Sequence, residues 1–425
     1  VRFFLTAPLF GLAAALVALV YGPDLLASTW SPAVLAFSHL LTLGFLSMVM
    51  CGAMLQMLPV VAAAPVPRVV AVGTLVHILL VLGTVLLAST FFSLQVGWMR
   101  LALVLFGTGF VLFLSASAVA LRRAPGPNAT ATGVGLALLS LAVTVVAGLL
   151  LGSGLLGIGG LERMPDLVRG HVGWALSGWV GLLLLAVSYQ VVPMFQVTPE
   201  YPAWMKKGLA WWLWLGLLGW SLLLFGANEG YWAQFWSAVG MAPVMAVFSL
   251  FAAETLRLQS RRKRRISDVT LMFWRSAMIC LLGCVLLWIL RQLLPGLLDS
   301  VRYSFLLGLL SLLGVAGGVI NGMLYKIVPF LSWFHLQHRQ LALQRLNVPI
   351  PTIKELISDR LAKGQFLLYL VALLLAICAI FYPVEFARPF ALVFAFSNLL
   401  LWLNLLGAVL RYRNSNRLLL AGRDA

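Results

Sequence analysis

Charged side chains are scarce in this sequence. Lysine, arginine, aspartate and glutamate make up 10% of its 425 residues, whereas hydrophobic residues make up 62%. This composition argues against a soluble globular protein, because a water-exposed surface needs far more charge. No disulfide framework is indicated, since the four cysteines all fall inside apolar runs. We therefore predict that lipid is the solvent for most of the chain.

Motifs for soluble enzyme chemistry are also missing. The sequence has no glycine-rich phosphate loop, no Cys-x-x-Cys-His heme attachment motif and no Ser-His-Asp arrangement in a soluble setting. Phosphoryl transfer, hydride transfer and hydrolysis therefore have no residues to carry them. Histidine is rare as well, with five in the chain, so each histidine in an apolar segment stands out.

The apolar residues fall into runs that are long enough to cross a hydrocarbon core of about 30 Å as helices. Twelve spans are predicted, at 3–21, 34–60, 69–91, 99–121, 134–156, 168–195, 208–226, 232–255, 270–294, 304–332, 365–383 and 389–410. The first run has no small-residue cleavage site, so we expect a span rather than a signal peptide. The predicted fold is an all-α polytopic protein of a bacterial-type cytoplasmic (inner) membrane.

Basic residues are distributed unequally between the two sides of the predicted membrane. The formal net charge is +17, and 22 lysines and arginines fall on one side against 6 on the other. By the positive-inside rule, the richer side and both termini are cytoplasmic. The basic run 261–265 is then a topology anchor, with contact to anionic lipid as a second role. Nucleic acid is not an expected partner.

One segment, residues 37–61, occurs three times. Aligned on a proline, its copies carry small residues and one polar residue at the same spacing: Gly44, Gly52, Gln56 and Pro59; Gly178, Ala186, Gln190 and Pro193; and Gly314, Gly322, Lys326 and Pro329. We predict three tandem four-helix repeats, 1–130, 131–265 and 266–425, arranged as arcs with pseudo-threefold symmetry. Gly44, Gly178 and Gly314 allow neighbouring helices to approach closely.

The third repeat contains the longest connection between spans. Residues 351–363 place apolar side chains at helical spacing after Thr352, which can cap a helix. We predict a short amphipathic helix on the cytoplasmic face.

His39 and His171 lie near the outer starts of corresponding helices in the first two repeats. A membrane histidine is costly unless it has a partner, and imidazole is the usual axial ligand of heme iron and a common copper ligand. Both residues are therefore candidates for cofactor and metal binding. The alternative is an interfacial histidine bonded to a backbone carbonyl or to water. The proline alignment pairs His171 with Phe37, two residues before His39.

Three further histidines and a methionine cluster have simpler explanations. His77 lies nearer the membrane middle, where a structural or proton-relay role is expected. His335 and His338 lie at a helix end where water can satisfy them. A group of soft side chains suits either monovalent copper or apolar packing, and packing is favoured; it comprises Met48, Met50, Cys51, Met54 and Met57.

The polar residues of the three repeats share one predicted depth. Gln56, Gln190 and Lys326 would form a ring near the cytoplasmic side. An intramembrane lysine is a functional candidate, and the alternative is a side chain that reaches the nearby interface.

Two helix starts carry a family resemblance. His-Leu-Leu-Thr-Leu-Gly at 39–44 and His-Val-Gly-Trp-Ala-Leu-Ser-Gly-Trp-Val-Gly at 171–181 resemble helices two and six of heme-copper oxidase subunit I, especially the nitric oxide reductase-like branch. They also resemble NnrS-type membrane heme proteins. The resemblance implies three four-helix arcs, with His39 as a heme ligand and His171 as a copper ligand.

The sequence also departs from that family. Residues 208–226, where the family has two adjacent copper-ligating histidines, contain none, and residues 303–330 lack the histidines that bind the hemes. Oxygen reduction by the family mechanism is therefore not expected.

These observations give one leading hypothesis and two alternatives. The first is a heme-binding membrane protein, with heme b as cofactor and copper as a second candidate, in electron transfer or in nitric oxide or copper stress handling. The alternatives are a transporter of a small solute or metal, since polar rings and tandem repeats also build transport pathways, and a metal-free assembly or scaffold protein. Expected partners are the bilayer and a second membrane subunit or a periplasmic redox protein.

The charge distribution predicts the topology directly. A reporter fused within 261–265 or after Ala425 should behave as cytoplasmic, because the opposite orientation would place 22 basic residues outside. Alkaline phosphatase fusions, which are active only in the periplasm, measure this. High phosphatase activity at both positions would show that the orientation is reversed.

Overall fold

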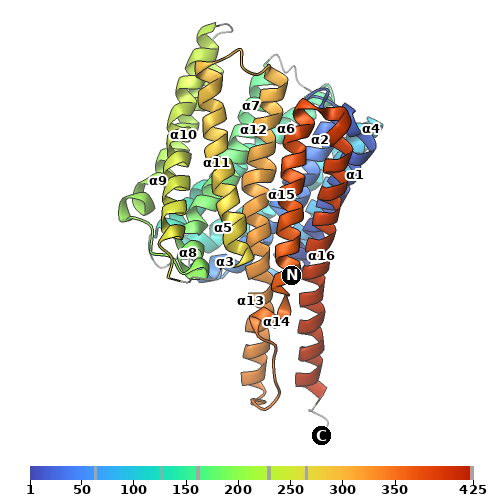
Figure 1. Ribbon diagram of the computed structural model, residues 1–425, viewed down its shortest axis with the longest axis vertical. Helices are drawn as coiled ribbons and strands as arrows, with labels where there is room; N and C mark the ends of the chain where they lie inside the picture. The colour runs from blue at the N-terminus through green and yellow to red at the C-terminus, as the bar shows by residue number, and fades with distance from the viewer. Residues whose placement is uncertain are drawn as a thin grey trace. The chain divides into compact units, whose positions relative to one another are not determined.

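The computed structural model describes residues 1–61, 65–124, 126, 128–158, 163–226, 231–263 and 267–421. Over these ranges the chain is helical, without a β-strand, and twelve helical stretches are long and apolar enough to span a membrane (Figure 1). The predicted fold class, an all-α polytopic membrane protein, is confirmed. The pseudo-threefold arrangement of three arcs stays a prediction.

Most spans are single α-helices, but three consist of two α-helices joined by a π-helical segment. The elements of the first half are α1 (Arg2–Tyr21), η1 (Gly22–Leu26), α2 (Pro32–His39), η2 (Leu40–Ser47), α3 (Met48–Val61), α4 (Val69–Ser93), α5 (Val96–Arg122), α6 (Ala129–Leu155), α7 (Met164–Gly173), η3 (Trp174–Gly181) and α8 (Leu182–Gln196). Those of the second half are α9 (Ala203–Gly226), α10 (Tyr231–Ser260), α11 (Val269–Leu293), α12 (Ser300–Leu309), η4 (Leu310–Gly317), α13 (Gly318–Ala342), α14 (Ile353–Leu356), α15 (Asp359–Phe381) and α16 (Pro383–Ala421).

The helices group into two compact units. Unit 1 comprises Val1–Val49, Ile266–Ala277 and Leu313–Ala425, and unit 2 comprises Met50–Arg265 and Met278–Leu312. Units are groups of packed helices, whereas the predicted repeats are segments of similar sequence. The division into units therefore does not test the repeats 1–130, 131–265 and 266–425, which stay a prediction.

The three π-helical segments lie at equivalent positions in the three similar segments. Each is eight residues long, and each begins 19 residues before its proline, from Leu40 to Pro59, from Trp174 to Pro193 and from Leu310 to Pro329. A π-helix shifts the hydrogen-bond pattern to i→i+5, and such segments are frequent at functional sites. The similarity of sequence thus has a counterpart in the backbone.

Two of the repeated glycines lie against side chains of neighbouring helices. A methyl group built on Gly44 would lie 2.4 Å from Phe10 Cγ of α1, and one on Gly178 would lie 2.8 Å from Ser140 Cβ of α6. Both distances are well inside van der Waals contact. The close approach expected at Gly44 and Gly178 is confirmed, and Gly314 is also buried.

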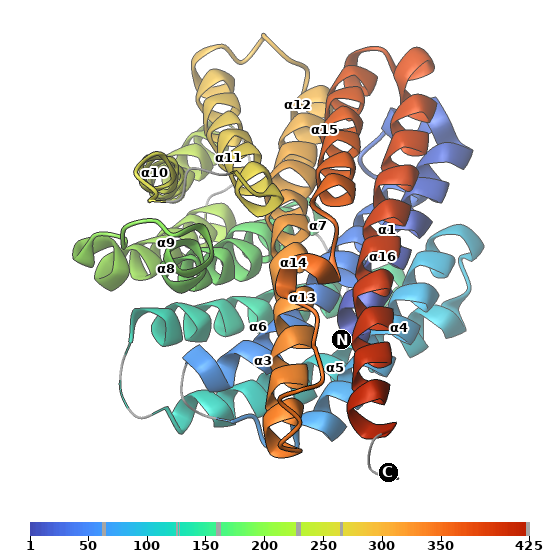
Figure 2. The ribbon, with the colours of Figure 1, turned by 60° about the horizontal axis from the view of Figure 1, so that its bottom comes forward.

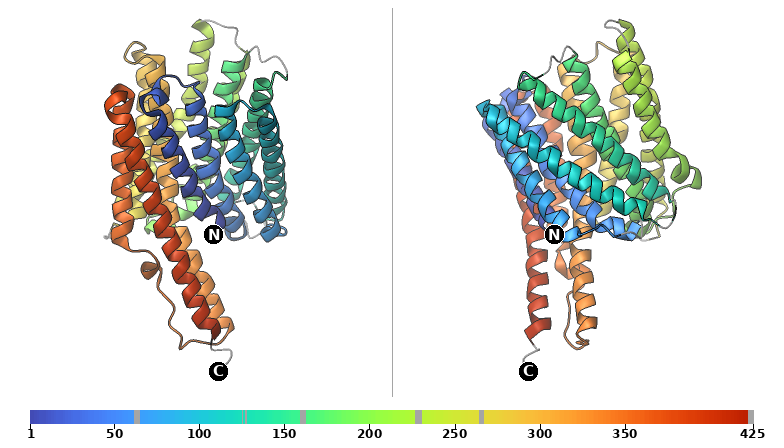
Figure 3. Two further views of the ribbon diagram at one scale, coloured as in Figure 1. Left: turned by 90° about the vertical axis from the view of Figure 1, so that its right-hand side faces the viewer. Right: turned by 180° about the vertical axis from the view of Figure 1, so that it is seen from behind.

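Unit 1 carries a helical extension that the sequence did not predict. The predicted span 304–332 continues as α13 to Ala342, and the predicted span 389–410 continues within α16 to Ala421. The two extensions lie side by side (Figures 1 and 3), where Arg339 Nη1 donates to Asn416 Oδ1 at 2.6 Å. Leu336 and Leu419 are fully buried there. The corresponding second helix, α8, ends three residues after Pro193, and the described part of α3 reaches Val61, two residues after Pro59.

The amphipathic helix predicted at 351–363 is wrong in its extent. Thr352 does cap a helix, in a reciprocal capping box with Glu355, but α14 ends at Leu356. Ile357 is extended and α15 starts at Asp359. Leu356 and Ile357 are buried, and Arg411 of α16 donates to the Leu356 carbonyl at 2.8 Å, so packing inside unit 1 interrupts the helix. Figure 2 shows α14 beside α13.

The predicted topology anchor follows α10 in unit 2. The backbone N–H of Lys263 donates to the Val197 carbonyl at 3.1 Å, at the end of α8. Arg264 and Arg265 lie outside the described residues. The side of the membrane that this run faces stays a prediction.

The contact at Gly44 predicts a test of the packing. Gly44→Ala should lower the stability of the detergent-solubilised protein by about 1–3 kcal/mol, because the added methyl overpacks against the root of the Phe10 side chain. The midpoint of thermal unfolding measures the loss. Gly219→Ala is the matched control, since a methyl there meets no heavy atom within 4 Å. Equal midpoints for the two variants would contradict the packing argument.

Candidate functional site

His39 ends α2 and directly precedes η2. Ser31 accepts from Val34 N at the start of this helix, and Pro32 occupies its first position. The Nδ1 of His39 lies 2.7 Å from the Leu35 carbonyl oxygen. A carbonyl oxygen can only accept, so Nδ1 carries the proton and Nε2 of the neutral ring carries the lone pair. Metal-ligating histidines commonly have this arrangement, in which the second nitrogen is anchored to a carbonyl.

His171 has the same kind of anchor but reaches another helix. Its Nδ1 lies 3.0 Å from the Thr144 carbonyl of α6, and its ring packs on Gly148, where a methyl would lie 3.0 Å from Cε1. His39 belongs to unit 1 and His171 to unit 2. The predicted cavity shared by the two residues stays a prediction.

The other histidines lie apart from these anchors. His77 is partly buried on α4. His335 is exposed near the end of α13, with Nδ1 2.7 Å from the Leu331 carbonyl, and the His338 ring contacts the Phe334 ring edge to face. The exposure expected for His335 and His338 is confirmed.

Within the part of the chain that the structure describes, no group of three His, Cys, Asp or Glu side chains could hold a metal ion. Met48, Met50, Cys51 and Met54 are buried, in keeping with the packing explanation. Heme differs from copper here, because its iron is held by one or two axial side chains.

Lys326 finds an acidic partner within unit 1. Its Nζ lies 2.7 Å from Asp268 Oδ2, and the side chains are 21% and 17% exposed. Asp268 also caps α11, because its Oδ1 accepts from Leu271 N at 3.0 Å. This pairing argues against a lysine that simply extends into water. Sequence reasoning missed Asp268, although it is the only acidic residue between Glu254 and Asp299.

A buried set of polar side chains lies next to this pair in unit 1. Gln365 Nε2 donates to Asn321 Oδ1 and Ser397 Oγ, both at 3.0 Å, and Asn404 donates to the Tyr325 hydroxyl at 2.9 Å. These residues come from α13, α15 and α16. Sequence reasoning missed this set too. The available signal was the isolated polar residues within apolar runs of α15 and α16.

The two glutamines of the predicted polar ring lie in unit 2. Gln56 Oε1 is buried and has no hydrogen-bond partner among the described residues, while Gln190 is partly buried on α8. Lys326 belongs to unit 1, so the ring stays a prediction. A different pair was not expected: Gln259 Nε2 donates to Gln196 Oε1 at 2.9 Å in the interior of unit 2.

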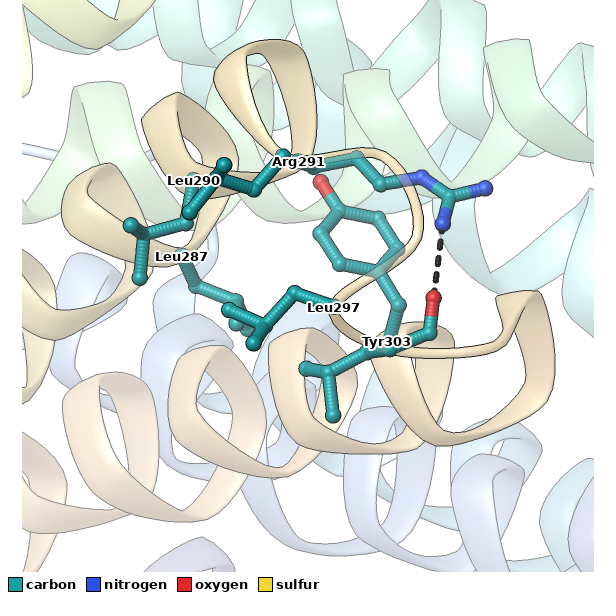
Figure 4. Close-up of a pocket in the computed structure, with 7 residues that line it drawn as sticks. Leu287, Leu290, Arg291, Leu297 and Tyr303 are labelled. Atoms are coloured by element: carbon teal, nitrogen blue, oxygen red, sulfur yellow. Dashed lines mark hydrogen bonds between the residues drawn. The ribbon is translucent and has the colours of Figure 1, made fainter.

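Unit 2 also contains a small hollow between the ends of α11 and α12 (Figure 4). Arg291 Nη1 donates to the Pro295 and Leu298 carbonyls at 3.0 and 2.8 Å, and the guanidinium lies 5.3 Å from the centre of the Tyr303 ring. Leucines complete the lining. The volume is about 10 Å³, roughly that needed by one water molecule. Arg291 thus stabilises the loop that follows α11 by bonding to its carbonyl groups, which is a structural role.

Comparison of the chain with known proteins finds no matching family model and no matching curated protein sequence.

The Lys326–Asp268 pair yields a quantitative prediction. Lys326→Gln should destabilise the protein by about 1.5–3 kcal/mol, because a partly buried carboxylate loses its charged donor. Asp268→Asn removes the charge but keeps a residue that can cap α11. A double-mutant cycle of these two changes, read from unfolding midpoints, isolates the interaction between the side chains.

A surface pair provides the matched control for this cycle. Lys206 Nζ lies 2.8 Å from Glu200 Oε2, but Glu200 is 77% exposed, so solvent screens the pair. Lys206→Gln should leave the midpoint unchanged. If Lys326→Gln is equally silent, the Lys326–Asp268 pair contributes nothing to the fold.

Proposed function

We propose that this chain is a heme-binding integral membrane protein of the cytoplasmic membrane, related to heme-copper oxidase subunit I. Its role is electron transfer or the handling of nitric oxide or copper stress, rather than oxygen reduction. The observation that carries this proposal is the orientation of His39. Its Nδ1–H is anchored 2.7 Å from the Leu35 carbonyl at the junction of α2 and η2, and in metal-ligating histidines with this anchor the other ring nitrogen is the ligand atom.

The local backbone supports the assignment of His39. The anchor is one turn back on the same helix, so α2 itself helps to orient the imidazole. The π-helical segment that begins at Leu40 is a feature common at functional sites. When bound, heme iron would supply one-electron redox chemistry, while His39 would hold and orient the heme.

His171 is also a proposed heme ligand. Its Nδ1 anchor on Thr144 gives the ring the same protonation pattern as His39. A periplasmic redox protein or a second membrane subunit is the proposed partner. The basic loops and both termini are assigned to the cytoplasmic side from the charge distribution.

A transporter of a small solute is the second candidate function. The partly buried Lys326–Asp268 pair and the amide cluster around Gln365 favour it. Ionisable and polar side chains inside a membrane bundle commonly line solute pathways.

The heme proposal predicts a visible absorption spectrum. The purified protein, expressed with heme available, should show a Soret band, and His39→Ala should remove most of it because the iron loses its anchored axial nitrogen. His171→Ala should shift or weaken the band. Protein levels are compared by in-gel fluorescence of a fused reporter.

His335→Ala is the matched control for these variants. His335 has the same anchor geometry, with Nδ1 2.7 Å from the carbonyl four residues earlier, but it is exposed in the extension of α13. Its spectrum should equal that of the wild type. A Soret band that survives the His39→Ala and His171→Ala double change would remove both residues from the site, and no band in the wild type would favour the transporter.

A further inference from the structure

The deepest polar cluster of unit 1 surrounds Gln365 on α15. Gln365 and Ser397 are fully buried and Asn321 is 2% exposed. The Gln365 amide nitrogen uses both hydrogens, one on Asn321 Oδ1 and one on Ser397 Oγ. Asn321 in turn donates to the Gly317 carbonyl, the last residue of η4, at 2.8 Å. The three side chains are therefore held in one orientation.

One hydrogen-bond acceptor in this cluster, the Gln365 amide oxygen, receives no donor from the described residues. Gln365 Oε1 is buried and makes no hydrogen bond to any residue in the described ranges. A buried amide oxygen without a partner costs about 1–3 kcal/mol. The Ser397 hydroxyl accepts from Gln365, so its own hydrogen is available to donate. An acceptor and a donor thus lie beside the same amide.

Further polar side chains, with increasing solvent exposure, continue from this cluster along α13. On α13, Asn321 is followed one turn later by Tyr325, whose hydroxyl accepts from Asn404, and then by Lys326, which pairs with Asp268. Five residues of helix separate Asn321 from Lys326, about 7.5 Å. Burial falls along the series, from Gln365 at 0% exposure to Lys326 at 21%.

Aromatic side chains border this series. The Phe273 ring stacks on Tyr325 at 6.4 Å between centroids and meets the Phe366 and Tyr369 rings edge to face at 4.8 and 5.4 Å. The Tyr369 hydroxyl donates to the Leu313 carbonyl inside η4. The aromatic rings thus lie beside the polar groups that continue from Leu313 to Asp268 in unit 1.

We propose that α13, α15 and α16 enclose a water-accessible polar pathway that opens at Lys326–Asp268 and ends at a binding site for one small hydrogen-bonding molecule at Gln365. The guest donates to Gln365 Oε1 and accepts from the Ser397 hydroxyl, and water is the smallest molecule that does both. Buried waters typically occupy sites with such unmet polar groups. The pathway is independent of heme binding at His39.

Hydroxyl-radical footprinting of the full chain in lipid nanodiscs tests the pathway. Radicals produced from bound water oxidise adjacent side chains, so Tyr325 and Tyr369 should be labelled roughly tenfold faster than equally buried tyrosines away from internal water. Tyr189 and Tyr201 of unit 2 are the controls, since they are also nearly fully buried and their hydroxyls bond to Met205 O and Thr255. Mass spectrometry quantifies oxidation of each tyrosine.

Two variants link the labelling to the proposed site. Gln365→Leu removes the unmet acceptor at similar volume, and Ser397→Ala removes the donor while leaving the amide. Each should reduce the labelling of Tyr369 toward that of Tyr201, with the unfolding midpoint and the Tyr201 rate showing that the fold is kept. Labelling of Tyr325 and Tyr369 in the wild type at the rate of Tyr189 and Tyr201 would overturn the proposal, whether or not either variant folds.

Discussion

Hydrocarbon offers no hydrogen-bond partners, so every polar group of this chain that lies among lipid must be satisfied by the protein itself. The backbone meets this requirement by being helical in each of the twelve spans. Hydroxyl side chains meet it locally, as where Thr84 and Thr255 donate to the carbonyl four residues earlier. Where the backbone departs from a regular α-helix, the same requirement means that other groups of the protein must satisfy the affected carbonyls.

The π-helical segments are such departures. A switch to i→i+5 bonding disturbs the carbonyl pairing of a helix, and in η4 side chains take up carbonyls: Asn321 bonds to Gly317 and Tyr369 to Leu313. In unit 1, α15 is therefore bonded to the π-helical segment η4. The polar side chains of α13 and α15 thus satisfy carbonyl groups of the π-helical backbone.

The histidines illustrate the same constraint with a different consequence. His39 and His171 both satisfy Nδ1 on a backbone carbonyl, which is the arrangement expected of an interfacial histidine and also of a metal ligand. The anchor thus removes part of the cost of placing imidazole in the membrane. The same anchor is therefore consistent with both explanations of these rings.

Local sequence patterns failed to predict two features of unit 1: the end of α14 and the long extensions of α13 and α16. Thr352 and Glu355 form a capping box, as a helix-start pattern predicts. Yet the helix stops after Leu356, because Leu356 and Ile357 are buried in unit 1 and Arg411 takes the Leu356 carbonyl. In the extensions, residues 333–342 and 411–421 contain both polar and apolar side chains. A prediction from hydropathy alone therefore ended both helices where the apolar runs end.

The sequence by itself determined the number of spans, the close approach at Gly44 and Gly178, and the spacing later matched by the π-helical segments. Those features follow from hydropathy, residue size and repetition, which are local. Only the tertiary structure decided that Lys326 pairs with Asp268 and that Gln365 joins Asn321 to Ser397. These partners lie 58, 44 and 32 residues apart in the chain, and a contact over such a separation depends on how the helices pack.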